Sequence, residues 1–275
     1  QDKRRGTPTF GLPPSAFVFY LQNHDQVANS IRSQRFHTMT SPGRHRAMTA
    51  LFLLAPATPM LFQGQEFAAS TPFHYFLDQQ SKLANDVRQG RRHFLSQFRS
   101  LAPPDSQACL VDPTDPQTFA RSKLDASERH SHAETLALHR DLLALRRGDP
   151  VFRGQSSGSY HLDGAVVGPE ALIVRYFGVD GDDRLLLLNL GLDVWLEPAP
   201  EPLLAPPFGR RWEVLWSSED PCYGGCGVAE SETQHGWYLP GQAAVVMTSR
   251  ILEDDPRGEH DPEPDHLEGE RPRPA

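Results

Sequence analysis

Two apolar runs near the start of the chain each end in a cluster of polar side chains. The run at 16–21 leads into Gln-Asn-His-Asp-Gln at 22–26, and the run at 56–62 leads into a second cluster that ends with Glu66. Unbroken apolar runs are typical of strands buried on both faces. The Ala- and Leu-rich segment at 48–55 predicts a helix between them. Strand, helix and strand, with polar groups at both strand ends, predict a βαβ unit of a (β/α)8 barrel.

The pattern changes after residue 130. Residues 131–148 place Leu at helical spacing, with Ser131 and Glu134 in the positions of a capping box and Pro150 expected to close the helix. Beyond this helix the apolar residues gather in short runs that Gly and Pro turns separate. These runs predict the strands of a small antiparallel β-sandwich, and they lie at 171–177, 184–189, 212–216 and 242–248.

The predicted fold class is therefore α/β plus all-β, in three parts. Residues 1–150 are expected to form the C-terminal part of a (β/α)8 barrel, namely its last two strands and helices. Residues 151–250 are expected to form a β-sandwich domain that can be separated from the barrel part. The tail at 251–275 has little to bury and is expected to be disordered. Because the first strand lies so near residue 1, the rest of the barrel is expected in a missing N-terminal portion.

Composition narrows the possible partners and the compartment. The net charge of −8 leaves no broad basic surface for nucleic acid. No apolar run is long enough to span a bilayer, so no membrane partner is expected. Three cysteines make no disulfide framework, and a cytoplasmic location is expected. Cys222 and Cys226 have a spacing that suits a metal, a local bridge or two loop cysteines, and the last interpretation is favoured. No metal and no cofactor is predicted.

The polar clusters carry the candidate chemistry. Asp25 offers a carboxylate that can stabilise developing positive charge or bind sugar hydroxyls, and His24 can donate to a neighbouring hydroxyl. The plainer alternative is a strand-end turn, because Asn and Asp favour turns. Glu66 has two interpretations, contact with substrate or pairing with an arginine beneath the site, and the second is favoured. The arginine-rich segment at 88–92 is either a solvated helix face or one wall of a sugar-binding cleft.

Several longer motifs resemble one family. The chain is similar to the malto-oligosyltrehalose trehalohydrolases, which are glycoside hydrolases of the α-amylase clan. The resemblance extends from about residue 4 to about residue 249. Asn-His-Asp alone indicates only the clan, whereas the flanking glutamines and the Ser-Thr-Pro-Phe segment indicate this family. The motifs that carry the resemblance are LQNHDQV at 21–27, TPMLFQGQE at 58–66, ASTPF at 69–73, DPQTF at 115–119, LWSSEDP at 215–221 and WYLPG at 237–241.

The resemblance implies a retaining mechanism with three carboxylates: an Asp nucleophile, a Glu general acid/base and a third Asp that stabilises the distorted sugar. Asp25 matches the third carboxylate, His24 matches a histidine that contacts the same sugar, and Asn23 fixes their turn. The residues expected to bind substrate are Gln22, Asn23, His24, Gln26 and Glu66. In the family the nucleophile and the acid lie on earlier strands. This chain is therefore expected to lack them and to be inactive alone.

The implied reaction cleaves the α-1,4 bond next to the terminal trehalose of malto-oligosyltrehalose and releases trehalose. The expected partner is a malto-oligosaccharide that ends in trehalose. Two alternatives remain open: another clan enzyme, such as a glycogen-branching enzyme, and a noncatalytic carbohydrate-binding module. The chain departs from the family at 28–30, where Ala-Asn-Ser replaces the usual Gly-Asn-Arg. Arg32 or Arg35 is expected to take the place of the lost arginine.

Overall fold

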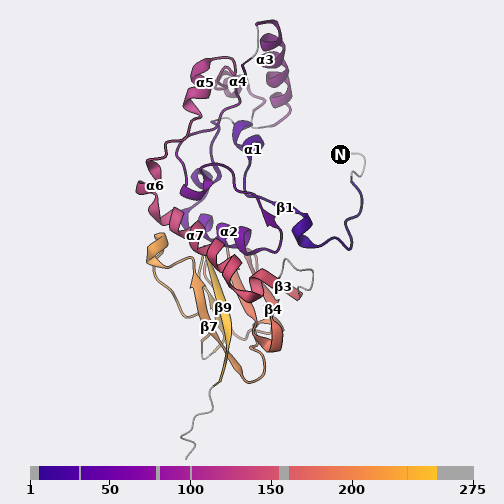
Figure 1. Cartoon of the computed structure of the whole chain (residues 1–275), viewed down its shortest axis with the longest axis vertical. Coiled ribbons are helices and arrows are strands. Elements are labelled where there is room, and N and C mark those ends of the chain that lie inside the picture. Colours follow the sequence, from indigo (N-terminus) through magenta and orange to yellow (C-terminus); the bar gives the residue numbers. More distant parts are fainter. Residues whose placement is uncertain are drawn as a thin grey trace, which may run out of the picture.

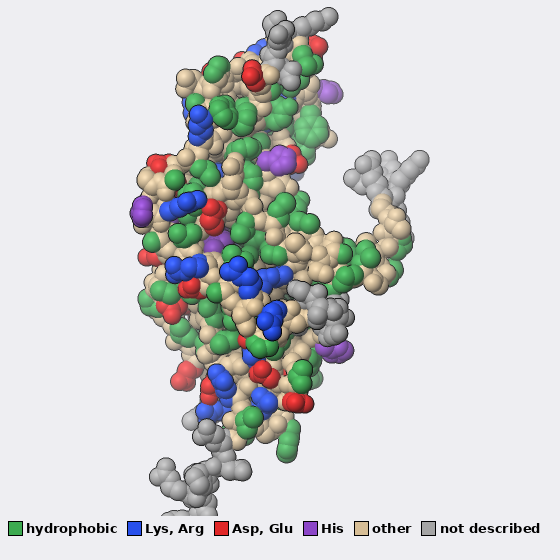
Figure 2. Space-filling view, viewed as in Figure 1, with side chains coloured by type: hydrophobic (Ala, Val, Ile, Leu, Met, Phe, Trp, Pro, Cys, Tyr) green, Lys and Arg blue, Asp and Glu red, His purple; other side chains and the backbone are tan. Residues whose placement is uncertain are grey.

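The computed structural model describes residues 6–30, 32–78, 81–99, 101–154, 161–233 and 235–252. Figure 1 shows an elongated molecule. Helices α3 (Ser81–Ser96), α4 (Pro104–Ala108) and α5 (Pro116–Arg121) lie at one end. Helices α2 (Pro42–Leu54) and α7 (Ala133–Gly148) cross the middle, and the β-sheet forms the other end. Figure 2 shows acidic and basic side chains interspersed on this face.

The predicted βαβ order is confirmed. Strand β1 (Val18–Phe19) pairs in parallel with β2 (Thr58–Pro59), and helix α2 (Pro42–Leu54) lies between them in the chain. Burial of the first strand on both faces was a wrong expectation, since the Val18 side chain is 59% exposed. The reason is that β1 and β2 pair only with each other among the described residues, so nothing covers the outer face.

The helix predicted at 131–148 is confirmed as α7 (Ala133–Gly148), which ends as predicted but begins two residues later. Ser131 belongs to the preceding helix, and the N-cap residue His132 makes no side-chain cap bond, so the predicted capping box is wrong. Pro150 opens the next helix because its fixed φ suits the first helical turn, where Asp149 accepts from the Val151 amide at 2.9 Å. The α-helices other than α2 are α1 (His24–Ala28), α3 (Ser81–Ser96), α4 (Pro104–Ala108), α5 (Pro116–Arg121), α6 (Glu128–Ser131), α7 (Ala133–Gly148) and α8 (Pro150–Gly154).

The second half of the described chain is an antiparallel β domain. A five-stranded sheet has the order β3-β4-β5-β9-β7, and a two-stranded sheet joins β6 to β8. The four predicted strands are confirmed as β4, β5, β7 and β9. The bounds are β3 (His161–Gly168), β4 (Ala171–Phe177), β5 (Arg184–Asn189), β6 (Val194–Leu196), β7 (Arg210–Ser217), β8 (Trp237–Leu239) and β9 (Ala243–Ile251).

Both faces of the five-stranded sheet are covered. One face packs on α2 and α7 in a cluster that includes Phe52, Leu142 and Val246. The other face packs on the β6–β8 ribbon in a cluster that includes Ile173 and Trp237. The two sheets therefore form an unequal sandwich. The boundary expected near residue 150 separates two segments of the sequence. It does not separate two hydrophobic cores, because the cluster that includes Phe52, Leu142 and Val246 contains residues from both sides of it.

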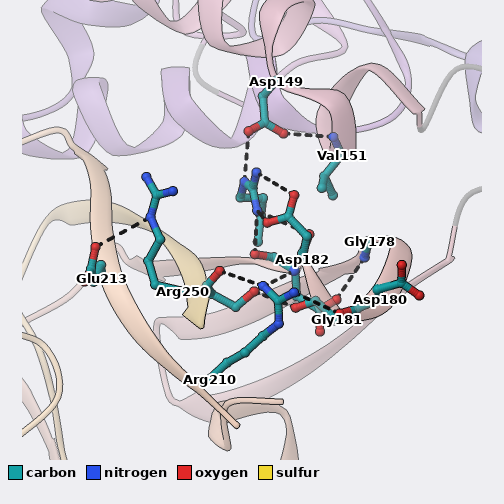
Figure 3. A network of polar contacts seen from close by, with 12 residues as sticks. Asp149, Val151, Gly178, Asp180, Gly181, Asp182, Arg210, Glu213 and Arg250 are labelled. Atoms are coloured by element: carbon teal, nitrogen blue, oxygen red, sulfur yellow. Dashed lines mark hydrogen bonds and ion pairs between the residues drawn. The ribbon is translucent and has the colours of Figure 1, made fainter. Parts of the chain in front are cut away.

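A polar network reinforces this junction. Asp149, at the corner between α7 and α8, accepts from Arg184 Nε of strand β5 at 2.8 Å (Figure 3). Arg184 Nη1 also donates to Asp182 at 2.6 Å. Both Arg184 and Asp149 have side chains less than 10% exposed. An ion pair in this setting holds the helices in one position on the sheet.

The tail prediction lies largely outside the described residues, because β9 ends at Ile251 and nothing is described from residue 253 onward. Within the described part of the chain, no helix is long and apolar enough to cross a membrane.

Candidate functional site

The polar cluster after β1 is the start of a helix. Asn23 is the N-cap of α1, and its Oδ1 accepts from the Asp25 amide at 2.8 Å. Gln26 reaches back, with its Oε1 accepting from the Asn23 amide at 3.0 Å. This reciprocal arrangement is a capping box. The side chains of Asn23 and Gln26 therefore set the direction in which the next two side chains point.

Those two side chains, His24 and Asp25, are exposed. Their side chains are 68% and 69% exposed, and His24 Nε2 lies 3.5 Å from Asp25 Oδ1. Both line a pocket with a volume of about 630 Å³. This volume is in the range of small-molecule sites. The carboxylate and the imidazole thus stand together at a cavity, with atoms free to meet a ligand.

Aromatic and basic side chains form the rest of this pocket. Arg91 of α3 lies over the Tyr75 ring, 4.3 Å from its centroid. Its Nη1 donates to Asn29 Oδ1 at 2.9 Å and its Nη2 donates to the Ala28 carbonyl at 2.7 Å. Burial lowers the pKa of Arg91. The other lining residues are Phe73, His74, Phe76, Val87, Gly90 and Phe94. One guanidinium therefore ties α3 to α1 and to an aromatic wall.

Sequence reasoning found Arg91 only as part of an arginine-rich segment, and Tyr75 not at all. The cleft-lining interpretation of that segment holds for Arg91, since it lines the pocket with His24 and Asp25. The Ser-Thr-Pro-Phe motif was the available signal for the aromatic wall, because Phe73 ends it and Tyr75 follows two residues later.

The arginine that bonds to the Asn29 side chain is Arg91. The expectation was that Arg32 or Arg35 replaces the arginine missing after Asn29. Arg35 is instead 1% exposed, and it donates to the Thr71 carbonyl at 2.6 Å and to the Gln63 carbonyl at 2.7 Å. It therefore fixes the loops behind the site. The guanidinium beside Asn29 comes from α3, which only the fold brings near.

Four predicted site residues are absent from the pocket lining: Asn23 and Gln26, which form the capping box, and Gln22 and Glu66. Gln22 is 3% exposed, and its Oε1 accepts from the Phe36 amide at 2.8 Å. Glu66 sits in a short 3-10 helix (Gln65–Phe67), with Oε1 3.9 Å from Arg129 Nη2. The arginine-pairing interpretation of Glu66 matches this contact. Of the six residues predicted for the site, the described pocket lining contains His24 and Asp25.

Comparison with known proteins gives this geometry a context. A family model described as "Domain of unknown function (DUF3459)" matches residues 161–246. A malto-oligosyltrehalose trehalohydrolase of Deinococcus radiodurans is 39% identical over 196 residues, which are 70% of this chain and 31% of that protein. The enzyme of the same name from Arthrobacter ramosus is 41% identical over 143 residues, 51% of this chain and 24% of that protein. The chain thus spans about a third or less of these relatives' length.

Solved structures agree on the fold. A crystal structure of a putative α-amylase from Salmonella typhimurium superposes with a TM-score of 0.66 at 28% identity, covering 90% of this chain and 37% of that one. A trehalose-6-phosphate hydrolase of Bacillus licheniformis gives a TM-score of 0.50 at 12% identity, covering 84% of this chain and 43% of the other. The second likeness shows the fold alone.

These matches point to one class, since over the matched regions the chain is similar to proteins of the α-amylase family of glycoside hydrolases. Within that class the chain is similar to the malto-oligosyltrehalose trehalohydrolases, and the resemblance that its motifs indicate is confirmed.

Proposed function

We propose that this chain is part of an enzyme that hydrolyses the α-1,4 bond next to the terminal trehalose of malto-oligosyltrehalose. One observation carries the proposal. The exposed carboxylate of Asp25 stands beside His24 at a pocket of about 630 Å³ with aromatic walls, directly after a parallel strand. Polar side chains at the C-terminal ends of parallel strands form the active sites of barrel enzymes. The names of the relatives supply the substrate.

The three-carboxylate mechanism gives each described residue a role. Asp25 stabilises the positive charge that develops on the sugar ring in the oxocarbenium-like transition state. His24 binds a hydroxyl of the same sugar. Asn23 and Gln26 hold the helix start that presents both side chains, and Gln22 and Glu66 support the surrounding loops. The nucleophile and the general acid belong to other strands of the longer protein in this proposal.

Two other functions would give different results in an assay of the same pocket. A glycogen-branching enzyme transfers a glucan segment to form a branch, and a noncatalytic module binds glucan without releasing product. The identities of 39% and 41% to trehalohydrolases favour hydrolysis. Trehalose release, new branches and binding alone are therefore the three outcomes that a product assay on malto-oligosyltrehalose distinguishes.

The test is Asp25→Asn in the longer protein. The change is isosteric and removes a charge needed mainly in the transition state, so kcat should fall by about 10²–10³-fold while KM changes little. Asp86→Asn is the matched control, because Asp86 is exposed on α3 and does not line the pocket. Far-UV circular dichroism should be the same for all three proteins. Near-wild-type kcat in Asp25→Asn rules out the role given to Asp25.

A further inference from the structure

The β6–β8 ribbon presents two aromatic rings to solvent. Val194 and Leu196 of β6 pack into the core, as do Trp237 and Leu239 of β8. Side chains alternate along a strand, so the residue between each pair points outward. These residues are Trp195 and Tyr238, which face each other in the antiparallel register.

The two rings form one surface, which we call the Trp195–Tyr238 ledge. Their centroids are 4.3 Å apart with an interplanar angle of 30°. Trp195 remains 58% exposed. An exposed indole stacked on a second ring in a short, paired ribbon is a rigid apolar platform with a polar rim. Rigidity matters, because little side-chain freedom is lost when a ligand stacks on it.

A carboxylate is fixed at the edge of the ledge. Asp193 accepts a hydrogen bond from the Tyr238 hydroxyl, and burial together with this carboxylate raises the pKa of Tyr238. Asp193 Oδ1 also accepts from the Gly241 amide at 2.7 Å. A Cβ at Gly241 would meet the Gly191 carbonyl at 2.9 Å, so the close approach of these loops requires glycine there. The carboxylate is thus held between the ledge and the neighbouring loop.

Asp193 also lines a cleft of about 620 Å³ between the start of α2 and the β domain. The cleft contains Arg46 and Glu219, whose side chains meet at 2.7 Å, and the polar side chain of Gln242. Gln242 has a φ of 53°, a left-handed conformation that is uncommon for a residue with a side chain. The cleft shares no residue with the pocket beside His24 and Asp25.

We propose that the ledge and this cleft bind an α-glucan chain, as a second site distinct from the pocket at Asp25. The apolar face of a glucose ring stacks on the indole, and its hydroxyls meet the carboxylate and the cleft. The guanidinium in the cleft is already paired with a carboxylate, so the charges there suit a neutral polyol that both donates and accepts hydrogen bonds. The choice of α-glucan over other sugars rests on the proposed function.

The test is isothermal titration calorimetry, in which maltoheptaose is titrated into the 1–275 chain. Trp195→Ala should weaken one binding event at least tenfold, and Asp193→Asn should weaken it several-fold. Phe208→Ala removes a fully exposed ring elsewhere in the β domain and is the matched control, which should change nothing. Cello-oligosaccharide of the same length, with β-1,4 links, should bind far more weakly.

The outcomes separate this site from the proposed function. Binding that depends on Trp195 but persists in Asp25→Asn supports the ledge, even if the longer protein releases no trehalose. Maltoheptaose affinity unchanged by Trp195→Ala overturns the proposal. So does a Trp195→Ala variant with unchanged glucan binding and a lower sedimentation coefficient, because the ledge would then be a contact between protein molecules.

Discussion

Arg46 and Glu219 face each other across the junction between α2 and the loop that follows β7. Arg46 Nη2 lies 2.7 Å from Glu219 Oε1 and 2.9 Å from Oε2, so one nitrogen reaches both carboxylate oxygens. The side chains are only 10% and 13% exposed. Arg46 Nη1 also donates to the Gly224 carbonyl at 3.2 Å. The pair therefore joins the two parts of the chain through side chains that are largely buried.

Glu219→Gln should reduce the free energy of unfolding by about 3 kcal/mol, because it leaves the Arg46 charge nearly buried without its partner. The urea midpoint measures the loss. Glu213→Gln is the control, since the Arg211–Glu213 pair has side chains 63% and 40% exposed and is expected to contribute less than about 1 kcal/mol. Equal shifts in the two variants contradict the structural role of the junction pair.

Three histidines, His37, His45 and His139, are packed together in the described structure. The His37 and His45 rings have centroids 5.9 Å apart, and those of His45 and His139 are 6.5 Å apart. Burial, followed by repulsion from neighbouring cationic groups, lowers the pKa of His45 to about 3 and that of His37 to about 4. Burial also lowers the pKa of His139. His37 and His45 are therefore neutral in the folded protein at pH 6–7.

This cluster predicts a loss of stability in mild acid. Between the unfolded pKa of about 6.5 and the lower folded values, the unfolded chain binds more protons, so stability falls as pH falls. The slope is at most about 1.4 kcal/mol per pH unit for each histidine. Urea midpoints at pH 7.5, 6.0 and 5.0 measure it, and His45→Gln should flatten the curve. An unchanged slope in His45→Gln rejects the histidines as its cause.

Arg91→Ala should loosen the pocket while leaving the fold intact. The variant removes the bonds to Asn29 and Ala28 and uncovers the Tyr75 ring. In the longer protein we expect KM for malto-oligosyltrehalose to rise roughly tenfold, since a charged hydrogen bond contributes about 1.5–3 kcal/mol. Steady-state kinetics measure this. Arg92→Ala is the control, because Arg92 is exposed and absent from the pocket lining, and its KM should be unchanged.

The strongest apolar runs were predictable, and the weaker elements were not. Strands β4 and β5 coincide with the predicted 171–177 and 184–189, since both lie in the middle of a sheet covered on two faces. Strands β6 and β8 have only three residues each. In β6 the outward-facing residue, Trp195, is apolar, so the sequence shows no alternation of apolar and polar residues there. The short helix α1 did carry a signal, namely Asn23 followed three residues later by Gln26.

The part of the site that lies in one continuous segment was predictable from the sequence. His24 and Asp25 were found because they follow an apolar run directly. Tyr75 and Arg91 complete the pocket from segments about 50 and 65 residues further along the chain. Their approach to α1 depends on how α3 packs, and no local pattern encodes that contact. The buried role of Gln22 was hidden for the same reason, because its partner is the amide of Phe36.

The shared core makes a prediction about the β domain. An isolated 151–250 segment would expose Leu186, Leu188 and Val246, which pack against α2 and α7 in the intact chain. We therefore expect the segment to aggregate or to unfold at lower temperature than the whole chain. Thermal denaturation followed by circular dichroism is the measurement. A cooperative transition as high as that of the whole chain would contradict this prediction and confirm that the β domain can be separated.

The 1–275 chain alone should release no trehalose. In the proposed mechanism the nucleophile and the general acid lie about 5–5.5 Å apart on other strands of the longer protein. Asp25 cannot replace either, because its proposed role is to stabilise the sugar rather than to attack it. The segment around β1 adds a physical expectation, since the apolar side chains of Phe17, Val18 and Tyr20 are 39%, 59% and 37% exposed. An uncovered apolar strand face favours self-association.

Both expectations are tested on one sample. Malto-oligosyltrehalose is incubated with purified 1–275 and with the longer protein, and trehalose is measured, while sedimentation velocity follows self-association. Val18→Lys places a charge on the exposed face and should reduce association without restoring activity. Val166→Lys, on the β domain at a residue 81% exposed, is the matched control and should leave association unchanged. Trehalose released by 1–275 would overturn the assignment of the nucleophile and the acid to other strands, because the described pocket holds no second carboxylate beside Asp25.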